Sequence, residues 1–210
     1  MIRAKEEEVV NAASHLFSAF VSFLVTVLLL IKLPEVNTLP IFILGLTSSW
    51  TFFGSFLYHS SFKEPKRSRN RVVDVAGIYI MIAGSGISIS LVCAESAIIG
   101  LSSSFLIFTV ASLLIAKFCL SRYPSEVFLI SSCVLLSWLS IFPSTGIFFP
   151  SSLPDERVMT LFLIGGLIYS LGVVFYILDS KKWYHTGWHV CVMLGFLFHY
   201  VSVCIGCGVI

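Results

Sequence analysis

Residues 183–210 read WYHTGWHVCVMLGFLFHYVSVCIGCGVI and contain no aspartate, glutamate, lysine or arginine. A transmembrane helix needs about 20 consecutive, mostly apolar residues to cross the hydrocarbon core of a bilayer. This run is therefore long enough to span a membrane. Because lipid offers the backbone no hydrogen-bond partners, a helix is the structure expected for it.

The rest of the chain repeats this pattern. The 210 residues are 57% hydrophobic and 11% charged, and charged positions divide the chain into seven uncharged runs of at least 20 residues. This composition is typical of a membrane protein. We therefore predict an all-α integral membrane protein, a single domain of residues 1–210 that forms a seven-transmembrane helix bundle. The expected helices cover residues 9–31, 39–62, 72–94, 96–116, 127–146, 158–178 and 183–207.

The distribution of basic residues predicts the orientation, because lysine and arginine accumulate in cytoplasmic loops. With the N-terminus inside, eleven of the thirteen basic residues lie on the cytoplasmic side, and Lys32 and Arg157 lie on the other. We expect a cytoplasmic N-terminus, an external C-terminus, and a place in the cell membrane among membrane lipids. The net charge of +2 reflects this topology. It does not indicate a nucleic-acid partner, which would require a basic face on a soluble domain.

Ionisable side chains inside the spans are the first candidates for function, because they are costly in a bilayer. Asp74 lies clearly inside an expected span, and all five histidines lie in uncharged runs. At about 1.5 Å of helix rise per residue, His59, Asp74, His185 and His189 lie within roughly 4 to 11 Å of the basic residues on the cytoplasmic side. Three helices therefore bring one carboxylate and three imidazoles to the same depth.

His185 and His189 are four residues apart, which places both rings on one helix face and lets them bind one metal ion. Taken alone, this pair is better explained by hydrogen bonds at the headgroup level. With His59 and Asp74 at the same depth, we expect a shared Zn²⁺ site, because three neutral imidazoles with a fourth position open to water are typical of catalytic zinc. Asp74 is either a fourth ligand or the group that holds or deprotonates the zinc-bound water, and we favour the second role.

Ser55 lies four residues before His59, on the same helix face and one turn deeper. Its hydroxyl can donate a hydrogen bond to the zinc-bound water or to a polarised carbonyl. Alternatively, it bonds the carbonyl four residues before it, as serine often does in helices. His199 lies about 15 Å beyond His189, outside the same coordination sphere, and we expect it to make an interhelical hydrogen bond.

Four polar residues mark the cytoplasmic approach to the first helix, and three alternatives stay open for them. They line the mouth of the metal site, bind lipid headgroups, or form an ordinary solvated turn. These residues are Glu8, Asn11, Ser14 and His15.

These segments together resemble the hemolysin III group of the progestin and adipoQ receptor family, whose superfamily includes the alkaline ceramidases. The resemblance rests on EVVNAASH (8–15), GSFLYHSS (54–61), RVVDVAGIYIMIAGS (71–85), YSLGVVFY (169–176) and HTGWHVCVMLGFLFHYVSV (185–203). It implies seven helices, an internal N-terminus, and a zinc site near the cytoplasmic face. In the family pattern His59, His185 and His189 match the zinc ligands, Asp74 lies beside the zinc-bound water, and Ser55 lies one turn from the first ligand.

Three functions are compatible with these residues. The favoured one is a zinc-dependent intramembrane hydrolase of lipid amides or esters, with Asp74 as general base and Ser55 or the metal stabilising the oxyanion. The second is a receptor or membrane-homeostasis protein in which zinc is structural. A pore-forming cytolysin is the third, and it is disfavoured because one buried acid in the bundle offers no evident polar lumen.

Overall fold

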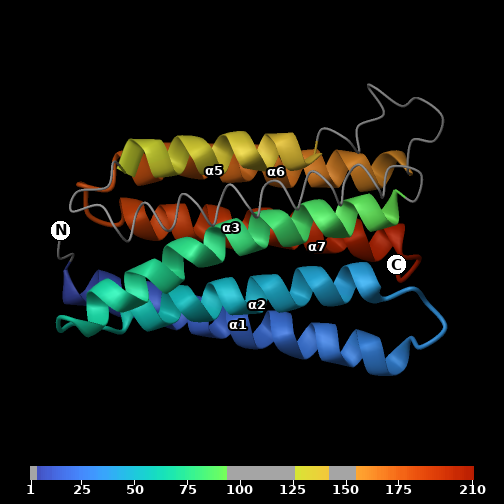
Figure 1. Cartoon of the computed structure of the whole chain (residues 1–210), viewed down its shortest axis with the longest axis horizontal. Helices are drawn as coiled ribbons and strands as arrows, with labels where there is room; N and C mark the ends of the chain where they lie inside the picture. Colours follow the sequence, from blue (N-terminus) through green and yellow to red (C-terminus); the bar gives the residue numbers. More distant parts are fainter. Residues whose placement is uncertain (1–3, 94–125, 142–154) are drawn as a thin grey trace.

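The structure is a computed structural model that describes residues 4–93, 126–141 and 155–210. All regular secondary structure in these ranges is α-helical, and the six helices lie side by side (Figure 1). The expected helix at 96–116 lies outside the described residues, so the count of seven stays a prediction. The helices are α1 (Lys5–Lys32), α2 (Leu39–His59), α3 (Lys66–Val92), α5 (Glu126–Ile141), α6 (Glu156–Ile177) and α7 (Tyr184–Gly206).

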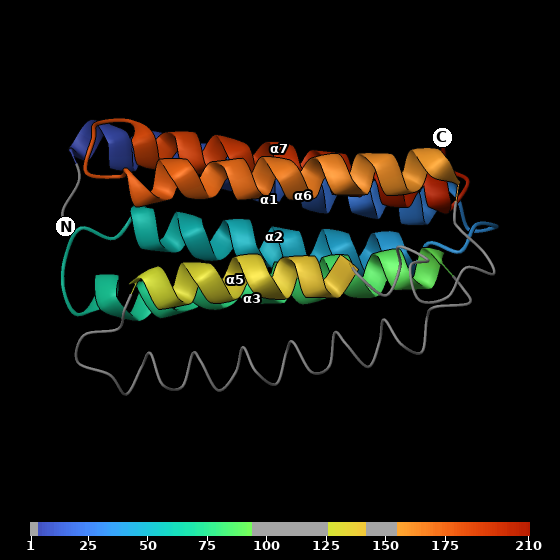
Figure 2. The same ribbon diagram turned by 90° about the horizontal axis from the view of Figure 1, so that it is seen from above.

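The described helices form a ring in chain order. Each helix from α1 to α7 packs against the next described helix, and α7 closes the ring by packing against α1. Seen from above, α3 and α5 lie on one side of α2, and α6 and α7 lie on the other (Figure 2). Side chains from six helices can therefore meet in the middle of the bundle.

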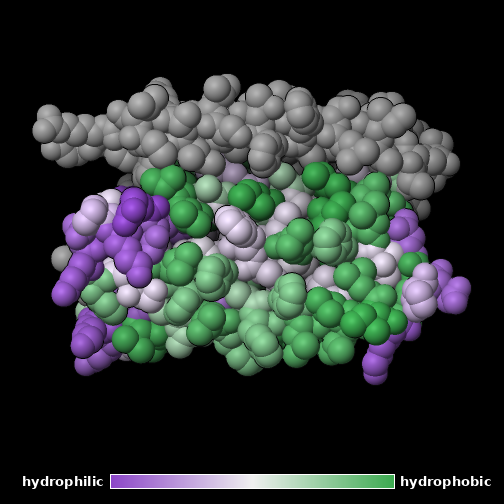
Figure 3. All heavy atoms as spheres, turned by 60° about the horizontal axis from the view of Figure 1, so that its bottom comes forward, coloured by the Kyte–Doolittle hydropathy of each residue, from purple (hydrophilic) through white to green (hydrophobic). Residues whose placement is uncertain are grey.

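The surface of the molecule is that of a membrane protein. Five helices, α1, α2, α3, α6 and α7, are long and apolar enough to cross a bilayer. On the face shown in Figure 3, hydrophobic side chains of the described residues predominate in the middle, and hydrophilic ones gather at the two ends. On α1 the large apolar side chains Phe17 and Phe20 are exposed, whereas Ser22 and Thr26 are buried. The prediction of an integral, multi-pass membrane protein is confirmed.

Two of the expected helices begin at the wrong residue. Helix α1 begins at Lys5 instead of residue 9, and α3 begins at Lys66 instead of residue 72. Charged residues mark the limits of the hydrocarbon core, but lysine, arginine and glutamate are good helix formers, and a helix can continue past that core. The basic segment 66–71 is therefore the start of α3. Helix α2 also ends at His59, three residues before the expected end at 62.

Polar contacts and close approaches hold α1 to its neighbours. The hydroxyls of Ser22 and Ser48 lie 2.9 Å apart, as do those of Thr26 and Tyr200. A Cβ atom at Gly45 would overlap the side chain of Thr26, so α1 and α2 approach closely where Gly45 has no side chain. Small residues at such contacts are typical of helices packed in membranes, where the hydrophobic effect does not drive association.

One end of the bundle carries most of the basic residues. Helices α1, α3 and α7 begin there, and α2 ends there (Figure 1). Eight of the ten lysines and arginines in the described residues belong to this end. Its assignment to the cytoplasm stays a prediction. The eight residues are Lys5, Lys63, Lys66, Arg67, Arg69, Arg71, Lys181 and Lys182.

Candidate metal centre

Three buried histidines meet at the basic end of the bundle. His59 is the last residue of α2, and His185 and His189 lie on the first two turns of α7. One ring nitrogen of each lies within 4.8 Å of the others, and the Nε2 atoms of His59 and His189 are 3.0 Å apart. A tetrahedral zinc ion with Zn–N bonds of about 2.0–2.1 Å holds its nitrogens about 3.3 Å apart. The spacing is therefore close to that of a zinc site.

Glu8 binds the outer nitrogen of the first histidine. Its Oε2 lies 2.5 Å from Nδ1 of His59, and its Oε1 accepts a hydrogen bond of 2.6 Å from Nη2 of Arg67. The guanidinium lies over the ring of Tyr58, 4.5 Å from its centroid, and donates to the backbone oxygen of Ser61 at 2.9 Å. Glu8 is only 1% exposed, so its carboxylate is charge-paired in the interior, as a buried charge requires.

The other two histidines also have partners at Nδ1. Nε2 of His15 lies 2.6 Å from Nδ1 of His189, and Oδ2 of Asp179 lies 3.6 Å from Nδ1 of His185. Nδ1 of His59 and Nδ1 of His189 are thus engaged by outer residues, which leaves Nε2 of both rings to bind a metal. Outer partners of this kind fix the tautomer and orientation of metal-binding histidines, so the residues present fit a zinc ion.

The polar residues of α1 separate into two groups. Glu8, Asn11 and His15 are buried, and Oδ1 of Asn11 accepts a hydrogen bond of 2.7 Å from Thr186 on α7. Ser14 is only partly buried and donates to the backbone oxygen of Asn11 at 3.0 Å. A solvated turn is therefore wrong for the first three residues, which pack against the histidines and α7. Ser14 is not brought to the group.

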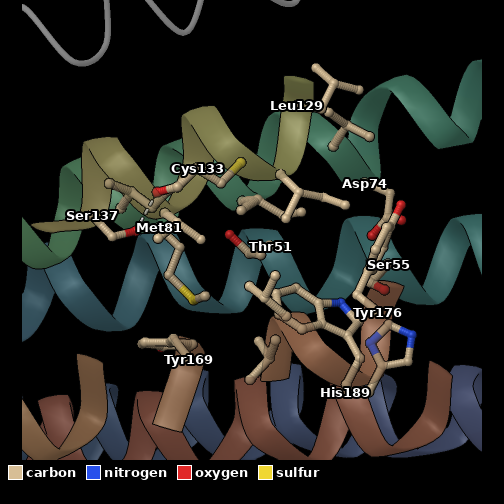
Figure 4. A pocket seen from close by; sticks show the side chains of 18 of the residues that line it. Thr51, Ser55, Asp74, Met81, Leu129, Cys133, Ser137, Tyr169, Tyr176 and His189 are labelled. Atoms are coloured by element: carbon tan, nitrogen blue, oxygen red, sulfur yellow. Dashed lines mark hydrogen bonds between the residues drawn. The ribbon is translucent and has the colours of Figure 1, made fainter. Parts of the chain in front are cut away.

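A cavity of about 430 Å³ adjoins the histidines and extends into the bundle. Asp74, Ser55, His185 and His189 line the part near the metal centre. Figure 4 shows Asp74, Ser55 and His189 together at one side of the cavity, with Tyr169 and Ser137 at the other. The lining between them is largely apolar, and it includes Met81, Ile82, Leu129, Val134, Val173 and Val192.

Ser55 and Asp74 both line this cavity, but their side chains differ in burial and in hydrogen bonding. The Oγ of Ser55 is buried and has no hydrogen-bond partner in the described part of the chain, whereas Ser48 and Ser49 bond the carbonyls four residues before them. The alternative in which Ser55 bonds its own helix is therefore wrong. Asp74 is half-buried, lines the cavity and lies outside the group of three ligand residues.

Comparison with known proteins identifies the family. The sequence model described as "Haemolysin-III related" matches residues 3–200. This chain belongs to the haemolysin-III family. Among curated haemolysin-III proteins, it is 25% identical over 202 residues to the "Hemolysin-3 homolog" of Bacillus subtilis (strain 168), covering 90% of this chain and 89% of the relative. It is 23% identical over 201 residues to "Hemolysin-3" of Bacillus cereus, covering 93% and 89%. No solved structure matches the chain.

The haemolysin-III resemblance expected from the motifs is thus confirmed. His199 also behaves as expected, because its Nε2 lies 3.0 Å from the backbone oxygen of Phe162 on the neighbouring helix. The sequence did not predict the roles of Arg67, Asp179 and Thr186. Arg67 and Asp179 are charged residues near span ends, where charge indicates topology, and the uncharged Thr186 carries no signal of its own. The signal that points to Arg67 is the burial of Glu8, since a buried carboxylate needs a cationic partner.

Proposed function

We propose that this haemolysin-III protein is a zinc-dependent intramembrane hydrolase of lipid amides or esters. The observation that carries the proposal is the convergence of His59, His185 and His189 beside an apolar cavity inside a membrane-spanning bundle. Three neutral imidazoles suit zinc and leave a fourth position for water or substrate. Carboxylate-rich sites, which suit magnesium, calcium and manganese, need ligands that this group lacks.

The cavity supports a lipid as the substrate. Its volume of about 430 Å³ lies within the range of roughly 300–1,000 Å³ that is usual for ligand pockets. An acyl chain among Met81, Leu129 and Val192 is stabilised by the burial of apolar surface. Its polar linkage then lies near Asp74 and Ser55, beside the histidines.

Bound zinc would supply a Lewis acid that polarises a carbonyl and acidifies a water. As the oxygen of the water bonds to the carbonyl carbon of the lipid, Asp74 accepts a proton from that water. Ser55 donates a hydrogen bond to the carbonyl oxygen, where negative charge develops. The bond from carbon to nitrogen or oxygen then breaks, and Asp74 passes the proton to the leaving amine or alkoxide. Proton transfer of this kind contributes typically 10²- to 10⁴-fold to a rate.

The test is turnover by purified protein in vesicles. Zinc content is measured by mass spectrometry, together with the release of fatty acid from a ceramide, an acyl amide and a phospholipid. We expect one zinc ion per chain, release from at least one lipid, and loss of release in Asp74→Asn with zinc retained. Asp155→Asn is the matched control, because Asp155 is an exposed cap at the start of α6. Stoichiometric zinc without release from any of the three lipids contradicts the proposal.

A receptor or membrane-homeostasis protein with structural zinc is the second candidate. Glu8 and His15 support it, because their contacts with His59 and His189 join α1 to α2 and α7 through the ligand rings. In this case His59→Ala lowers the melting temperature strongly, and Asp74→Asn leaves the function unchanged. In the hydrolase, Asp74→Asn removes turnover with little change in the melting temperature.

A further inference from the structure

Besides Ser55 and His15 beside the metal centre, two polar atoms on the wall of the cavity have no hydrogen-bond partner in the described residues. They are Oη of Tyr169 on α6 and Nδ1 of His199 on α7, and both atoms are buried. Both residues line the cavity, and their rings meet edge to face with centroids 5.2 Å apart. Two neighbouring helices therefore present polar groups to one region of an otherwise apolar wall.

This region lies far from the metal centre. His199 follows His189 by ten residues on α7, which corresponds to about 15 Å along the helix. In Figure 4, Tyr169 lies on the opposite side of the cavity from Asp74 and Ser55. The mechanism proposed above uses neither residue.

A buried polar atom without a partner is destabilising, so two such atoms on one cavity wall indicate a site where a polar ligand binds. The other polar groups here are already satisfied. Nε1 of Trp138 donates to Ser170 at 3.2 Å, and Ser137 donates to the backbone oxygen of Cys133 at 2.7 Å. Among the described residues at this end of the cavity, the unsatisfied atoms are therefore those of Tyr169 and His199.

The tautomer of His199 defines the missing group. Its Nε2 lies 3.0 Å from the carbonyl oxygen of Phe162, which can only accept, so Nε2 carries the proton. In a neutral imidazole Nδ1 is then an acceptor, whereas the hydroxyl of Tyr169 can donate. The complementary ligand must donate to His199 and accept from Tyr169. An alcohol does both with one oxygen atom, whereas a carbonyl cannot donate and an ammonium cannot accept.

We propose that Tyr169 and His199 form a second polar site, which binds a hydroxyl group on the hydrophobic chain of a lipid. An extended chain advances about 1.2 Å per single bond, so 15 Å corresponds to roughly twelve bonds from the group held at the histidines. The ligand is a fatty acyl chain with a hydroxyl near its twelfth carbon. The site does not depend on turnover, because the same recognition serves an enzyme or a receptor.

The test measures binding to the zinc-loaded, full-length protein in detergent. The probes are octadecanoic acid and its 12-hydroxy and 6-hydroxy derivatives. Satisfying the two buried atoms is expected to favour the 12-hydroxy acid over the unsubstituted acid by about tenfold, which corresponds to roughly 1.4 kcal/mol. The 6-hydroxy acid has the same polarity, but its hydroxyl falls in the apolar part of the cavity and gains no such preference.

The variant Tyr169→Phe tests whether the preference for the 12-hydroxy acid comes from this site. This variant keeps the ring that contacts His199 and Gly195, and it is expected to lose the preference for the 12-hydroxy acid. Tyr200→Phe is the control, because the hydroxyl of Tyr200 bonds Thr26 and Tyr200 is not part of the cavity lining. Comparing the ratio of affinities within each variant cancels differences in how the probes partition into detergent.

Two results overturn the proposal. If the wild-type protein binds the 12-hydroxy and unsubstituted acids equally, Tyr169 and His199 hold only water. If Tyr169→Phe keeps the preference, another part of the chain recognises the hydroxyl. Neither result concerns hydrolysis, so a failure here is distinct from a failure of the proposed function.

Discussion

Nε2 of His15 lies 2.6 Å from Nδ1 of His189. The contact joins α1 to α7, and the rings meet nearly at right angles with centroids 4.2 Å apart. Because Nε2 of His189 lies beside His59, the His15 ring determines which nitrogen of His189 is turned toward the metal centre. The first helix is therefore part of this centre.

Glu8→Gln is expected to weaken zinc binding by about 10- to 100-fold, the usual effect of losing an outer partner of a metal-binding histidine. The amide cannot replace the charge that Glu8 places against His59 and Arg67. Competition with a fluorescent chelator measures the affinity. Glu7→Gln is the matched control, because Glu7 is also buried and takes no part in the contacts of the histidine group. Equal losses in both variants would show that Glu8 acts only through the stability of α1.

His15→Phe is expected to lower zinc affinity over a similar range of about 10- to 100-fold. Phenylalanine keeps an aromatic ring against Phe52, whose centroid lies 5.4 Å from that of His15, but offers no atom to Nδ1 of His189. Zinc titration followed by calorimetry checks the result. Ser14→Ala provides the comparison, since Ser14 bonds only the backbone of its own helix. Unchanged affinity in His15→Phe would rule out orientation of His189 by His15.

Ser55→Ala separates activity from stability. Since the buried hydroxyl has no partner in the described residues, its removal should leave the melting temperature unchanged or slightly raised. Turnover should fall by about 10²-fold if the hydroxyl stabilises the developing charge on the carbonyl oxygen. In Ser49→Ala, which loses a bond of 2.6 Å to Gly45, turnover should stay at the wild-type level. A fall in melting temperature that matches the fall in turnover would assign Ser55 a structural role.

Gly45→Ala is expected to destabilise the contact between α1 and α2 by about 1–3 kcal/mol, the usual cost of overpacking. The new methyl group would overlap the side chain of Thr26 and disturb its hydrogen bond with Tyr200. The double variant Gly45→Ala with Thr26→Ala removes the two nearest atoms of Thr26, Oγ1 and Cγ2, and leaves its Cβ 2.8 Å from the new methyl group. The free energy of unfolding, measured in mixed micelles, should partly recover in the double variant. If the losses of the two single variants simply add, the strain lies elsewhere.

The depth of the three histidines in the membrane could be predicted from the sequence. Uncharged runs and basic residues place each helix along the membrane normal, and the spacing of His185 and His189 fixes their shared face. This is enough to bring them to the level of His59, which the structure confirms. The rise per residue is almost constant in a helix, so positions along the axis follow from counting.

The positions of the helices in the plane of the membrane could not be predicted in the same way. The contacts of Glu8 with His59 and Arg67 depend on how α1, α2 and α3 are ordered and rotated around the ring. Neither quantity follows from hydropathy. The expected start of the first helix at residue 9 also placed Glu8 outside it, whereas α1 begins at Lys5 and buries this carboxylate.

Helix α1 is weakly embedded in the bundle. In its most apolar stretch of 18 residues, only 22% of the residues are buried, compared with 61% in the corresponding stretch of α3. The buried residues of α1 include Glu8, Asn11, His15, Ser22 and Thr26. Two of these residues contact the rings assigned to the metal. A ligand that binds only the folded arrangement stabilises that arrangement by mass action, so a metal ion held by these rings would be thermodynamically linked to the docking of α1. If the proposed zinc ion binds here, its occupancy and the docking of the amino-terminal helix belong to one equilibrium, and the availability of metal sets how firmly this helix is held.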